Sequence, residues 1–564
     1  MPDRTSHHAL VLCGLCLAPL PALAADFTIT TDTAITNGGF VIAPTDTLTA
    51  TSGITMTMPP GVHAMASAAA SVTVTNNGTI SVSDTGIGIS LSGVSSVAVN
   101  NGLIVANGEG AGGISMLASS ADALNTGTIR VAGGGGPAVY FDQNTTRFRN
   151  TGRLAASFGV ALDFAGAENA LLLDVGSHVE GAMILGGSTF VTIATGAANS
   201  LDFSFTGVPW FSMTVTGTVP HVVDVAGQRV ASIDPTQFSA MQTGMTDSAS
   251  QVFGAIGLHS EGVLAGGGAD VRVSSRTGQP APDAAIPGPG WANAYGTASR
   301  YSASGNNLAY ATGQAGIIAG VDLSRRAGRV FGIAVGGGQM QFGADGIFQR
   351  SHRIQSRAVF VSAYGAWQIG NAVLDVGPTG AMQRHDSQRA INNNLAPGGI
   401  DTGIAEYNSH FIAPSVSVRR SFVLGSGDNL VLTTRAALGI TAGVVDAYSE
   451  TASLGTASFA ARAFSIGTGS ADVELARSFG DTVMTGRLGI AAETAFGNEA
   501  ISGTLLGLPW TYDAGSGAGF AGQVGLTVDH RFGARFVGQI AAQSSFGSAG
   551  LASTKGSASL RVEF

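Results

Sequence analysis

The sequence predicts an all-β protein built from an N-terminal parallel β-helix, one pore-threading α-helix and a C-terminal transmembrane antiparallel β-barrel of about 12 strands. Three observations predict this fold class. An Asn-x-Gly motif recurs at nearly constant spacing, an apolar stripe at helical spacing follows it, and alternating apolar and polar residues continue to the last residue. We divide the chain into residues 1–24, 25–233, 234–257, 258–290 and 291–564.

Residues 1–24 are typical of a secretory signal peptide. Arg4 lies near the start, residues 9–20 form an apolar run, and small residues precede Ala25 as a cleavage site. The apolar run is too short for a transmembrane anchor. Both cysteines fall in this segment, so we expect a mature chain without a disulfide, a thiolate metal site or a cysteine nucleophile.

Residues 25–233 are predicted to form the β-helix, because the Asn-x-Gly motif recurs every 24 or 25 residues. Asn and Gly tolerate left-handed backbone, so each motif is expected to turn the chain sharply. The predicted turn residues are Asn76, Gly78, Asn100, Gly102, Asn125, Gly127, Asn150 and Gly152. The residues expected to share one interior are Ile80, Ile104, Ile129 and Leu154. At about 24 residues per coil, this segment would form roughly eight or nine coils, and a rise of about 4.8 Å per coil gives a rod of about 40 Å. A β-propeller is the alternative fold, but each of its blades needs about 40 residues.

Residues 234–257 are predicted to form a helix that could thread the barrel. Asp234 can cap it, and Pro235 suits the first helical position. Residues at spacings of three and four then form one apolar stripe: Phe238, Met241, Met245, Ala249, Val252 and Ile256. The helix would be about 31 Å long, close to the apolar thickness of a membrane. A helix packed on the outside of the β-helix is the alternative.

Residues 258–290 are rich in Gly, Ala, Pro and Ser, which predicts a flexible linker. Residues 291–564 are predicted to form the barrel, because apolar and polar residues alternate over segments of about ten residues separated by short turns. About twelve strands can be placed, and residues 497–516 are the hardest to assign.

The last strand has one apolar and one polar face. Leu560, Val562 and Phe564 lie on the face that would meet lipid, and Arg561 lies on the face that would meet a wet lumen.

Composition and motifs narrow the function classes. Residues 26–230 carry 5 Arg against 13 acidic residues, a net charge of −8, which argues against a nucleic-acid partner. No serine-protease nucleophile loop, G-x-S-x-G elbow, H-E-x-x-H helix or Walker loop occurs. We therefore expect no catalytic site, no cofactor and no metal site.

The layout resembles that of the monomeric autotransporters of Gram-negative bacteria, the type V secretion proteins. The matching features are the signal peptide, the Asn-Gly repeats, the start of the helix at residues 230–235, and a barrel that opens with Trp291-Ala-Asn-Ala-Tyr295-Gly and ends on Phe564. The resemblance implies a barrel in the outer membrane that carries the N-terminal part, the passenger, to the cell surface. It implies help from the barrel-assembly machinery and periplasmic chaperones, with Leu560, Val562 and Phe564 as the assembly signal. A barrel of this length in one chain argues for a monomer.

Two hypotheses remain for the passenger, residues 25–233. It is either a non-enzymatic adhesin or aggregation factor that meets a host or bacterial surface, or a surface hydrolase without a recognisable motif. A third interpretation makes the barrel a plain porin-like channel. A helix in the lumen would argue against that channel, since it would conduct poorly.

Overall fold

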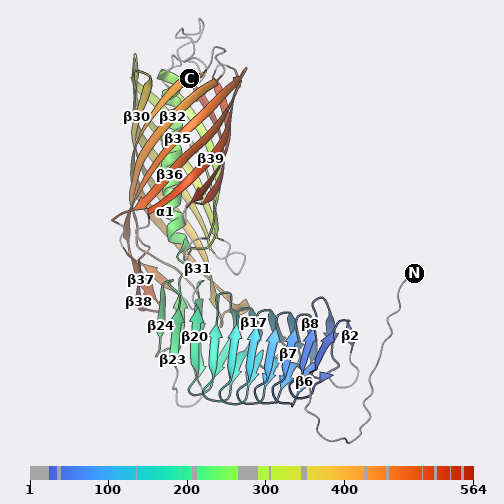
Figure 1. The fold of residues 1–564 in the computed structure, drawn as a ribbon. Helices are drawn as coiled ribbons and strands as arrows, with labels where there is room; N and C mark the ends of the chain where they lie inside the picture. The colour runs from blue at the N-terminus through green and yellow to red at the C-terminus, as the bar shows by residue number, and fades with distance from the viewer. Residues whose placement is uncertain are drawn as a thin grey trace, which may run out of the picture.

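The computed structural model describes residues 25–34, 40–134, 136–194, 196, 199–205, 212–264, 290–303, 307–344, 352–424, 430–452, 456–497, 500–513, 518–533, 535–547 and 552–563. The predicted signal peptide, most of the predicted linker and Phe564 lie outside the described residues. A solenoid of stacked coils runs across the end of an upright barrel, and a helix lies along the barrel axis (Figure 1). The predicted fold class is confirmed: a parallel β-solenoid, one long helix and a 12-strand antiparallel barrel.

The solenoid has three parallel faces. The first face is a 9-stranded sheet of β1 (Asp26–Ile29), β4 (Thr47–Ala50), β7 (Thr73–Asn76), β10 (Val97–Asn100), β13 (Asp122–Asn125), β16 (Arg147–Asn150), β18 (Ala170–Leu173), β20 (Phe190–Ala194) and β23 (Ser212–Thr216). The second face begins with β2 (Thr33–Ala34), β5 (Thr55–Thr57), β8 (Thr79–Ser83), β11 (Leu103–Asn107) and β14 (Thr128–Ala132). The third begins with β3 (Phe40–Val41), β6 (Met65–Ser67), β9 (Ile87–Leu91), β12 (Gly112–Met116) and β15 (Val139–Phe141).

Long strands join the second and third faces near the barrel. The first half of β17 (Arg153–Phe164) pairs with β14 and its second half with β15. The next coil follows the same path in β19 (His178–Leu185), which pairs with β17 and then with β22 (Ser204–Phe205). Nine strands on the first face, about 4.8 Å apart, agree with the predicted rod of about 40 Å.

The solenoid interior is apolar, with one polar ladder. Ile80, Ile104, Ile129 and Leu154 stack in register and are fully buried, as predicted. The repeated Asn residues are also fully buried, and each donates its Nδ2–H to the Oδ1 of the next: 2.8 Å from Asn76 to Asn100, 2.7 Å from Asn100 to Asn125 and 2.7 Å from Asn125 to Asn150.

The explanation predicted for the repeat is therefore corrected. The motifs do lie at the corner between the first and second faces, but neither their Asn nor their Gly residues have left-handed backbone. Each Asn ends a strand and points inward, and each Gly is needed for close stacking. A Cβ on Gly102 would lie 2.0 Å from the carbonyl oxygen of Gly78, and one on Gly127 would lie 2.0 Å from that of Gly102.

One set of left-handed non-glycine residues recurs at a different corner, before the first face. They are Thr45, Ser71, Ser95, Ser120, Thr145, Glu168 and Ser188, all with positive φ. None is Gly or Asn, the two residue types on which the turn prediction rested.

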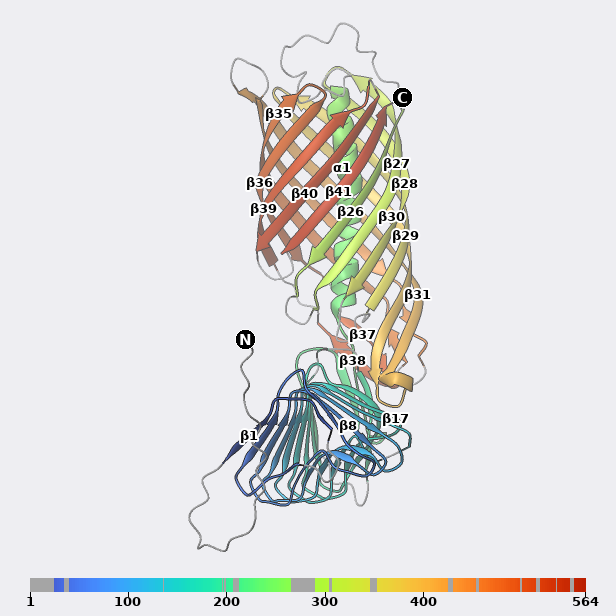
Figure 2. The ribbon, with the colours of Figure 1, turned by 90° about the vertical axis from the view of Figure 1, so that its right-hand side faces the viewer.

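The helix, α1 (Thr236–Leu264), follows the solenoid and lies inside the barrel in both views (Figures 1 and 2). It continues to Leu264, beyond the predicted end at residue 257, so residues 258–264 are helical and not part of a flexible linker. The prediction ended with the apolar stripe, whereas the last two turns carry His259 and Glu261, whose partners are on the barrel wall. Across the part of the chain that the structure describes, no helix is both long and apolar enough to cross a bilayer.

Twelve antiparallel strands form the barrel. They are β26 (Gly290–Tyr301), β27 (Tyr310–Arg326), β28 (Arg329–Ala344), β29 (His352–Ile369), β30 (Ala372–Asn393), β31 (Ile400–Leu424), β32 (Leu430–Val445), β35 (Arg462–Phe479), β36 (Thr482–Ala495), β39 (Ala518–Arg531), β40 (Phe536–Gly547) and β41 (Ser553–Glu563). Pairing of β26 with β41 and of β30 with β31 closes the sheet, so one chain supplies the whole barrel.

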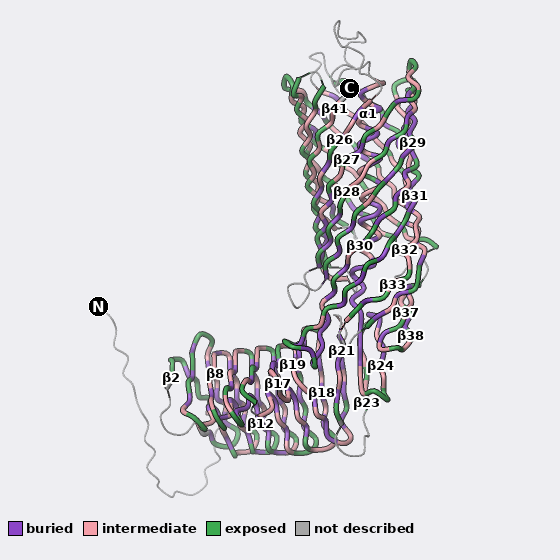
Figure 3. Tube along the Cα trace, turned by 180° about the vertical axis from the view of Figure 1, so that it is seen from behind, coloured by how far each residue is buried: buried purple, intermediate pink, exposed green. Residues whose placement is uncertain are grey.

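Exposed and buried residues alternate along the barrel strands (Figure 3). The outward residues include Ile317, Val335, Val361, Leu488, Ile540 and Leu560, all substantially exposed. This apolar outer wall is the one that a barrel presents to lipid.

Loop lengths give the barrel its orientation. The strand ends that residues 327–328, 370–371, 425–429, 480–481 and 532–535 join in sequence lie at one end of the barrel. The strand ends joined by residues 302–309, 345–351, 394–399, 446–461, 496–517 and 548–552 lie at the other. Outer-membrane barrels have short periplasmic turns and longer extracellular loops. The solenoid therefore lies at the extracellular end, and the carboxyl end of α1 points toward the periplasm.

Two small sheets surround the extracellular mouth. One contains β33 (Tyr448–Ser449), β34 (Ala457–Phe459), β37 (Ile501–Leu505) and β38 (Leu508–Tyr512), and it accounts for the region that the sequence left hardest to assign. The other contains β21 (Asn199–Asp202), β24 (His221–Asp224) and β25 (Arg229–Ser232), and it continues into barrel strand β30. The 3-10 turn η1 (Pro397–Gly399) lies between β30 and β31.

The Asn ladder predicts a difference between two adjacent residues. Asn100→Ala removes two buried hydrogen bonds and leaves the amides of both neighbours short of a partner, so we expect the solenoid to lose about 1–3 kcal/mol of unfolding free energy. Asn101→Ala, where the side chain is exposed, is the control and should change it by less than about 0.5 kcal/mol. Urea unfolding of the purified full-length protein measures both, and equal losses would contradict the ladder's role.

Candidate functional site

The candidate functional site is the barrel lumen together with α1. The helix packs against the wall formed by β26–β32 and β35. Most of the predicted stripe lies in this interior, because Met241, Met245, Val252 and Ile256 are buried in one apolar cluster with wall residues. Phe238 instead packs in a separate cluster with Phe459 and Trp510. The helix thus lies within the barrel and not against the outside of the solenoid.

The extracellular end of the helix is capped and held by aromatic packing. Asp234 accepts hydrogen bonds from the Thr236 amide at 3.0 Å and from the Thr236 hydroxyl at 2.6 Å, which satisfies the first turn. Burial raises the pKa of the Asp234 carboxyl. Phe238 lies 5.8 Å from the Phe459 ring, and the Arg462 guanidinium lies 4.6 Å from the Phe238 ring centroid.

The middle of the helix is fixed to the wall by polar contacts. The Lys555 ammonium lies 3.0 Å from Asp247, whose other oxygen accepts a hydrogen bond from Tyr301 at 2.9 Å. Lys555 is the chain's single lysine. The Gln314 side-chain amide donates to the carbonyl of Gly244 at 3.0 Å, where the wall approaches the helix closely.

The periplasmic end of the helix is held by a buried cluster. The Nε2 of His259 lies 3.0 Å from the Asp322 carboxylate, which also accepts hydrogen bonds from Tyr364 at 2.6 Å and from Arg325. The His259 ring stacks on Trp291 with centroids 4.7 Å apart, and the Trp291 indole donates to the Tyr364 hydroxyl at 2.8 Å. These residues complete one another's hydrogen bonds in an interior where an unpaired charge would be costly.

Two further contacts extend this periplasmic anchor. Arg419 lies between Asp375, at 3.0 Å, and helix residue Glu261, at 4.0 Å. Arg561 of the closing strand donates to the carbonyl of Leu258, which places its side chain in the lumen as the alternation predicts. Leu560 is exposed on the outer wall and Val562 is half-buried, while Phe564 lies outside the described residues.

Most of these lumen partners were not identified from the sequence. His259 and Asp322 are isolated polar residues within long segments, and only the tertiary fold brings them together. A carboxylate partner for Lys555 could have been predicted, because a lone lysine on the lumen face of a strand needs one. Among the described residues, no group of three or more His, Cys, Asp or Glu side chains is placed to hold a metal ion. The absence of cofactors and metals stays a prediction.

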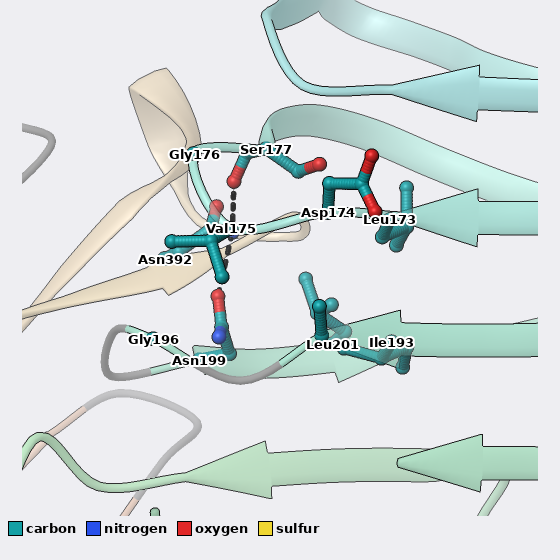
Figure 4. Close-up of a pocket in the computed structure, with 11 residues that line it drawn as sticks. Leu173, Asp174, Val175, Gly176, Ser177, Ile193, Gly196, Asn199, Leu201 and Asn392 are labelled. Atoms are coloured by element: carbon teal, nitrogen blue, oxygen red, sulfur yellow. Dashed lines mark hydrogen bonds between the residues drawn. The ribbon is translucent and has the colours of Figure 1, made fainter. Parts of the chain in front are cut away.

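A second site is the contact between the solenoid and the barrel, which we call the joint and define by Asn392 and Asn394 of the barrel and the solenoid segments 177–181 and 199–202. Asn392 donates to the carbonyl of Ser177 at 3.0 Å and to the side chain of Asn199 at 2.9 Å (Figure 4). Asn394 donates to the carbonyls of Gly181 at 3.2 Å and Asp202 at 2.9 Å.

His178 packs beside the joint. It is buried, and a Cβ on Gly399 of η1 would lie 2.4 Å from its Nε2. Burial, followed by the nearby positive charge of Arg153, lowers the pKa of the His178 ring. The joint therefore favours the neutral imidazole.

The sequence model of the family described as "Autotransporter beta-domain" matches residues 290–543. No curated protein matches. The chain is similar to the translocator domain of the autotransporter NalP from Neisseria meningitidis, at 14% identity over 49% of this chain and 88% of that chain, with a TM-score of 0.38.

Two further solved structures are similar to the chain. One is the beta domain of the Bordetella autotransporter BrkA, at 15% identity over 49% of this chain and 100% of that one, with a TM-score of 0.34. The other is the transport unit of the autotransporter AIDA-I from Escherichia coli, at 10% identity over 53% and 99%, with a TM-score of 0.34.

Loss of the periplasmic anchor should loosen the helix. His259→Ala removes a buried partner of Asp322 and a ring stacked on Trp291, which weakens the helix–wall contact by about 1–3 kcal/mol. We expect more frequent channel openings in planar bilayers and greater antibiotic sensitivity of cells. Ser250→Ala, at an exposed helix position, is the control. A His259→Ala barrel that remains as closed as the control would contradict the anchoring role.

Acid should weaken the joint through His178. Because the pKa of this ring is lowered in the folded protein, the unfolded chain binds the proton more readily as pH falls below about 6.5. The stability present above that pH is then lost by at most about 1.4 kcal/mol per pH unit. Thermal melting of the solenoid between pH 7.5 and pH 5 measures the effect, and His178→Gln is the matched variant without this titration. Equal pH dependence in both proteins would exclude His178 as the cause.

Proposed function

This chain is an autotransporter, whose barrel secretes its own N-terminal solenoid, and we propose that the solenoid acts at the cell surface as a non-enzymatic adhesin or aggregation factor. The barrel stands in the Gram-negative outer membrane and the passenger is exported to the surface. The proposal concerns what the passenger does there.

A threonine array on the coils farthest from the barrel carries the proposal. On the first face, Thr28, Thr49 and Thr75 stack in register and point outward. On the second face, Thr55 stacks on Thr79 in the same way. Such rows repeat one hydroxyl group about every 4.8 Å without charge, which suits many weak contacts made in parallel.

The charged residues of the passenger are concentrated nearer the barrel, where they pair with one another. Arg147 lies 2.8 Å from Asp122, Arg149 pairs with Asp174, and Arg153 lies 3.6 Å from Glu180. Each of these ion pairs links side chains of two successive coils. The distal coils carry no such pairs, because their charged residues are all acidic, with Asp26 and Asp32 exposed beside the threonine rows.

The hydrolase alternative needs an acid–base pair in a cleft. One pocket beside the joint has a cavity volume of only about 10 Å³, and it is lined by residues between β18 and β21 and by Asn392 (Figure 4). Asp174 is its single titratable residue, and this carboxylate is paired with Arg149. This pocket therefore offers no acid–base pair to a hydrolase.

The expected partners of the barrel follow from its assignment as an autotransporter barrel in the outer membrane. We propose that outer-membrane lipid surrounds the apolar wall, and that periplasmic chaperones and the barrel-assembly machinery receive the chain. Leu560, Val562 and Phe564 would be the residues that the machinery recognises. The support is the outward side chain of Leu560 on the strand that closes the barrel.

Deleting the passenger tests the adhesin role. A non-adherent host expressing the full chain should aggregate and settle, whereas the same host expressing the chain without residues 26–230 should not. Equal settling of the two strains, together with hydrolysis of an ester, peptide or glycan by cells displaying the full chain, would replace the adhesin with the hydrolase.

Removing the distal hydroxyls is a sharper test. Thr49→Val with Thr75→Val keeps the branched β-forming shape and removes two stacked hydroxyls, so we expect adhesion to fall while surface display is unchanged. Thr192→Val with Thr214→Val makes the same change in the same register near the barrel and is the matched control. If both pairs reduce adhesion equally, the distal array is not the contact surface.

The closing strand tests the assembly signal. Phe564→Asp should leave the chain in the periplasm, because the terminal aromatic on the lipid side is lost. Fractionation with heat-modifiability of the barrel band measures insertion. Wild-type amounts of the folded outer-membrane band would refute the assignment, and Glu563→Asp, a conservative change at the adjacent position, is the control.

A further inference from the structure

Five exposed arginines surround the periplasmic end of the barrel. Each lies in a short connection or within five residues of one, next to β27 and β28, near the ends of β31 and β35, and between β39 and β40. Among the described residues at this end, Asp481 is the one exposed acidic side chain. We call these arginines the arginine ring: Arg326, Arg329, Arg420, Arg477 and Arg535.

The arginine ring has no carboxylate partner within the part of the chain that the structure describes. The ion pairs nearest to it use other arginines, Arg325, Arg419 and Arg487, whose partners lie in the lumen. Arg326 and Arg329 are moreover directly opposite each other in the β27–β28 ladder. Like charges at such a pair repel each other, so an anion between them would stabilise this end of the hairpin.

The ring lies at the edge of the apolar outer wall. Arg329 shares the outward face of β28 with the exposed Val335, and the next polar residue on that face is Gln339. Ten residues at about 3.3 Å each, tilted by about 40°, cover a height of about 25 Å, which is that of the apolar band of such barrels. Arg329 therefore lies at the depth of the periplasmic headgroups. By the same alternation, Arg420 and Arg477 point outward from β31 and β35.

Aromatic rings accompany the arginines on this outward face. The Arg420 guanidinium lies 4.8 Å from the ring centroid of Phe422, and that of Arg477 lies 5.2 Å from that of Phe479. Aromatic residues form girdles where a barrel meets the two surfaces of the membrane. A cation–π contact holds the guanidinium at this level without removing its charge, so its N–H groups stay available to an anion.

We propose that the arginine ring binds the phosphate groups of anionic phospholipids in the periplasmic leaflet. Guanidinium groups match phosphate oxygens with paired hydrogen bonds, and clustered cations beside a bilayer attract anionic lipid. A lipid fits this position better than a soluble partner, because its acyl chains can lie along the apolar wall directly below the arginines. The inference rests on the lipid-surrounded wall proposed above, and it adds the leaflet and the headgroup.

Trp367 provides a native reporter beside the ring. It lies on the outward face of β29 with the exposed Ile369, opposite Arg329 in the ladder, and its ring packs edge-on against Phe331 with centroids 5.0 Å apart. Phospholipids with brominated acyl chains quench an indole that they contact. The Trp367→Phe variant gives the fluorescence of the other tryptophans, so the difference isolates the lipid next to Arg329.

The test uses the full-length protein in bilayers that mix phosphatidylglycerol with phosphatidylcholine, with one lipid brominated at a time. At Trp367 we expect phosphatidylglycerol to be preferred by about fivefold, the factor that one cation near an anionic surface contributes. About 0.5 M salt should reduce this preference, because it screens surface charges within a few Å.

Two variants of matched charge show whether the ring is the cause. Arg326→Gln with Arg329→Gln should lower the preference at Trp367 to about one. Arg357→Gln, an exposed position on the same strand nearer the extracellular side, should leave it unchanged. Heat-modifiability of each barrel shows that it is folded.

A second reporter tests the opposite part of the ring. Phe479→Trp in the Trp367→Phe background places an indole beside Arg477. Phosphatidylglycerol should again be preferred, and Arg477→Gln should remove that preference.

The outcomes separate the two proposals. If brominated phosphatidylcholine quenches both reporters but neither reporter prefers phosphatidylglycerol, the ring does not bind anionic headgroups and serves a soluble periplasmic partner, while the lipid-surrounded wall stands. A preference that survives the arginine substitutions would also overturn the ring. If neither brominated lipid quenches Trp367, the lipid-surrounded wall itself is wrong.

Discussion

The constraint on which this structure depends is that a β-sheet cannot leave its edge unpaired where water is absent or where a neighbour is needed for stacking. In the membrane the constraint is met by closure, because β26 pairs with β41 and no edge remains in the hydrocarbon. In the solenoid each coil pairs with the next along three faces. At the junction of the two parts, β30 meets the constraint for both, since it belongs to the barrel wall and also lies between β19 and β21.

A similar constraint applies to the charged side chains in the barrel lumen, which need partners of opposite charge. A barrel of this size must fill its interior, and here the filling is a helix whose polar groups match those of the wall. Asp247 faces Lys555, His259 faces Asp322, and Glu261 faces Arg419. Removing the helix would leave wall charges without their partners, so the helix is held by the cost of that separation as well as by its apolar stripe. This explains how an amphipathic helix with a modest apolar face can remain in the pore.

The sequence was informative where periodicity is local. The period of two in the barrel and of 24 or 25 in the solenoid predicted both architectures, and Phe238 to Ile256 predicted the helix. It was least informative where a strand leaves the bilayer. The extensions of β29 and β31, which begin at His352 and Ile400, carry polar residues on both faces, so the alternation marks no clear start for these strands.

The misread repeat has a similar cause. Asn followed by Gly suggests left-handed turns, and nothing in one copy of the motif distinguishes that role from a buried ladder. The distinction lies in contacts between copies, since Asn100 meets Asn76 and Asn125 only after three coils have stacked. The joint escaped sequence analysis for the same reason: Asn392 and Ser177 lie 215 residues apart in the chain.

The inserted strand also decides how the passenger is presented. A solenoid tethered only through α1 could swivel at the mouth of the barrel, whereas one that shares a strand with the wall has a fixed direction. That direction runs across the barrel axis, so the rod extends along the membrane surface and not away from it (Figure 1). The long side faces of the solenoid carry the threonine rows, and in this orientation a whole face can contact a neighbouring surface at once. Contacts that are individually weak gain most from this arrangement, because all of them can form at once on a rigid support.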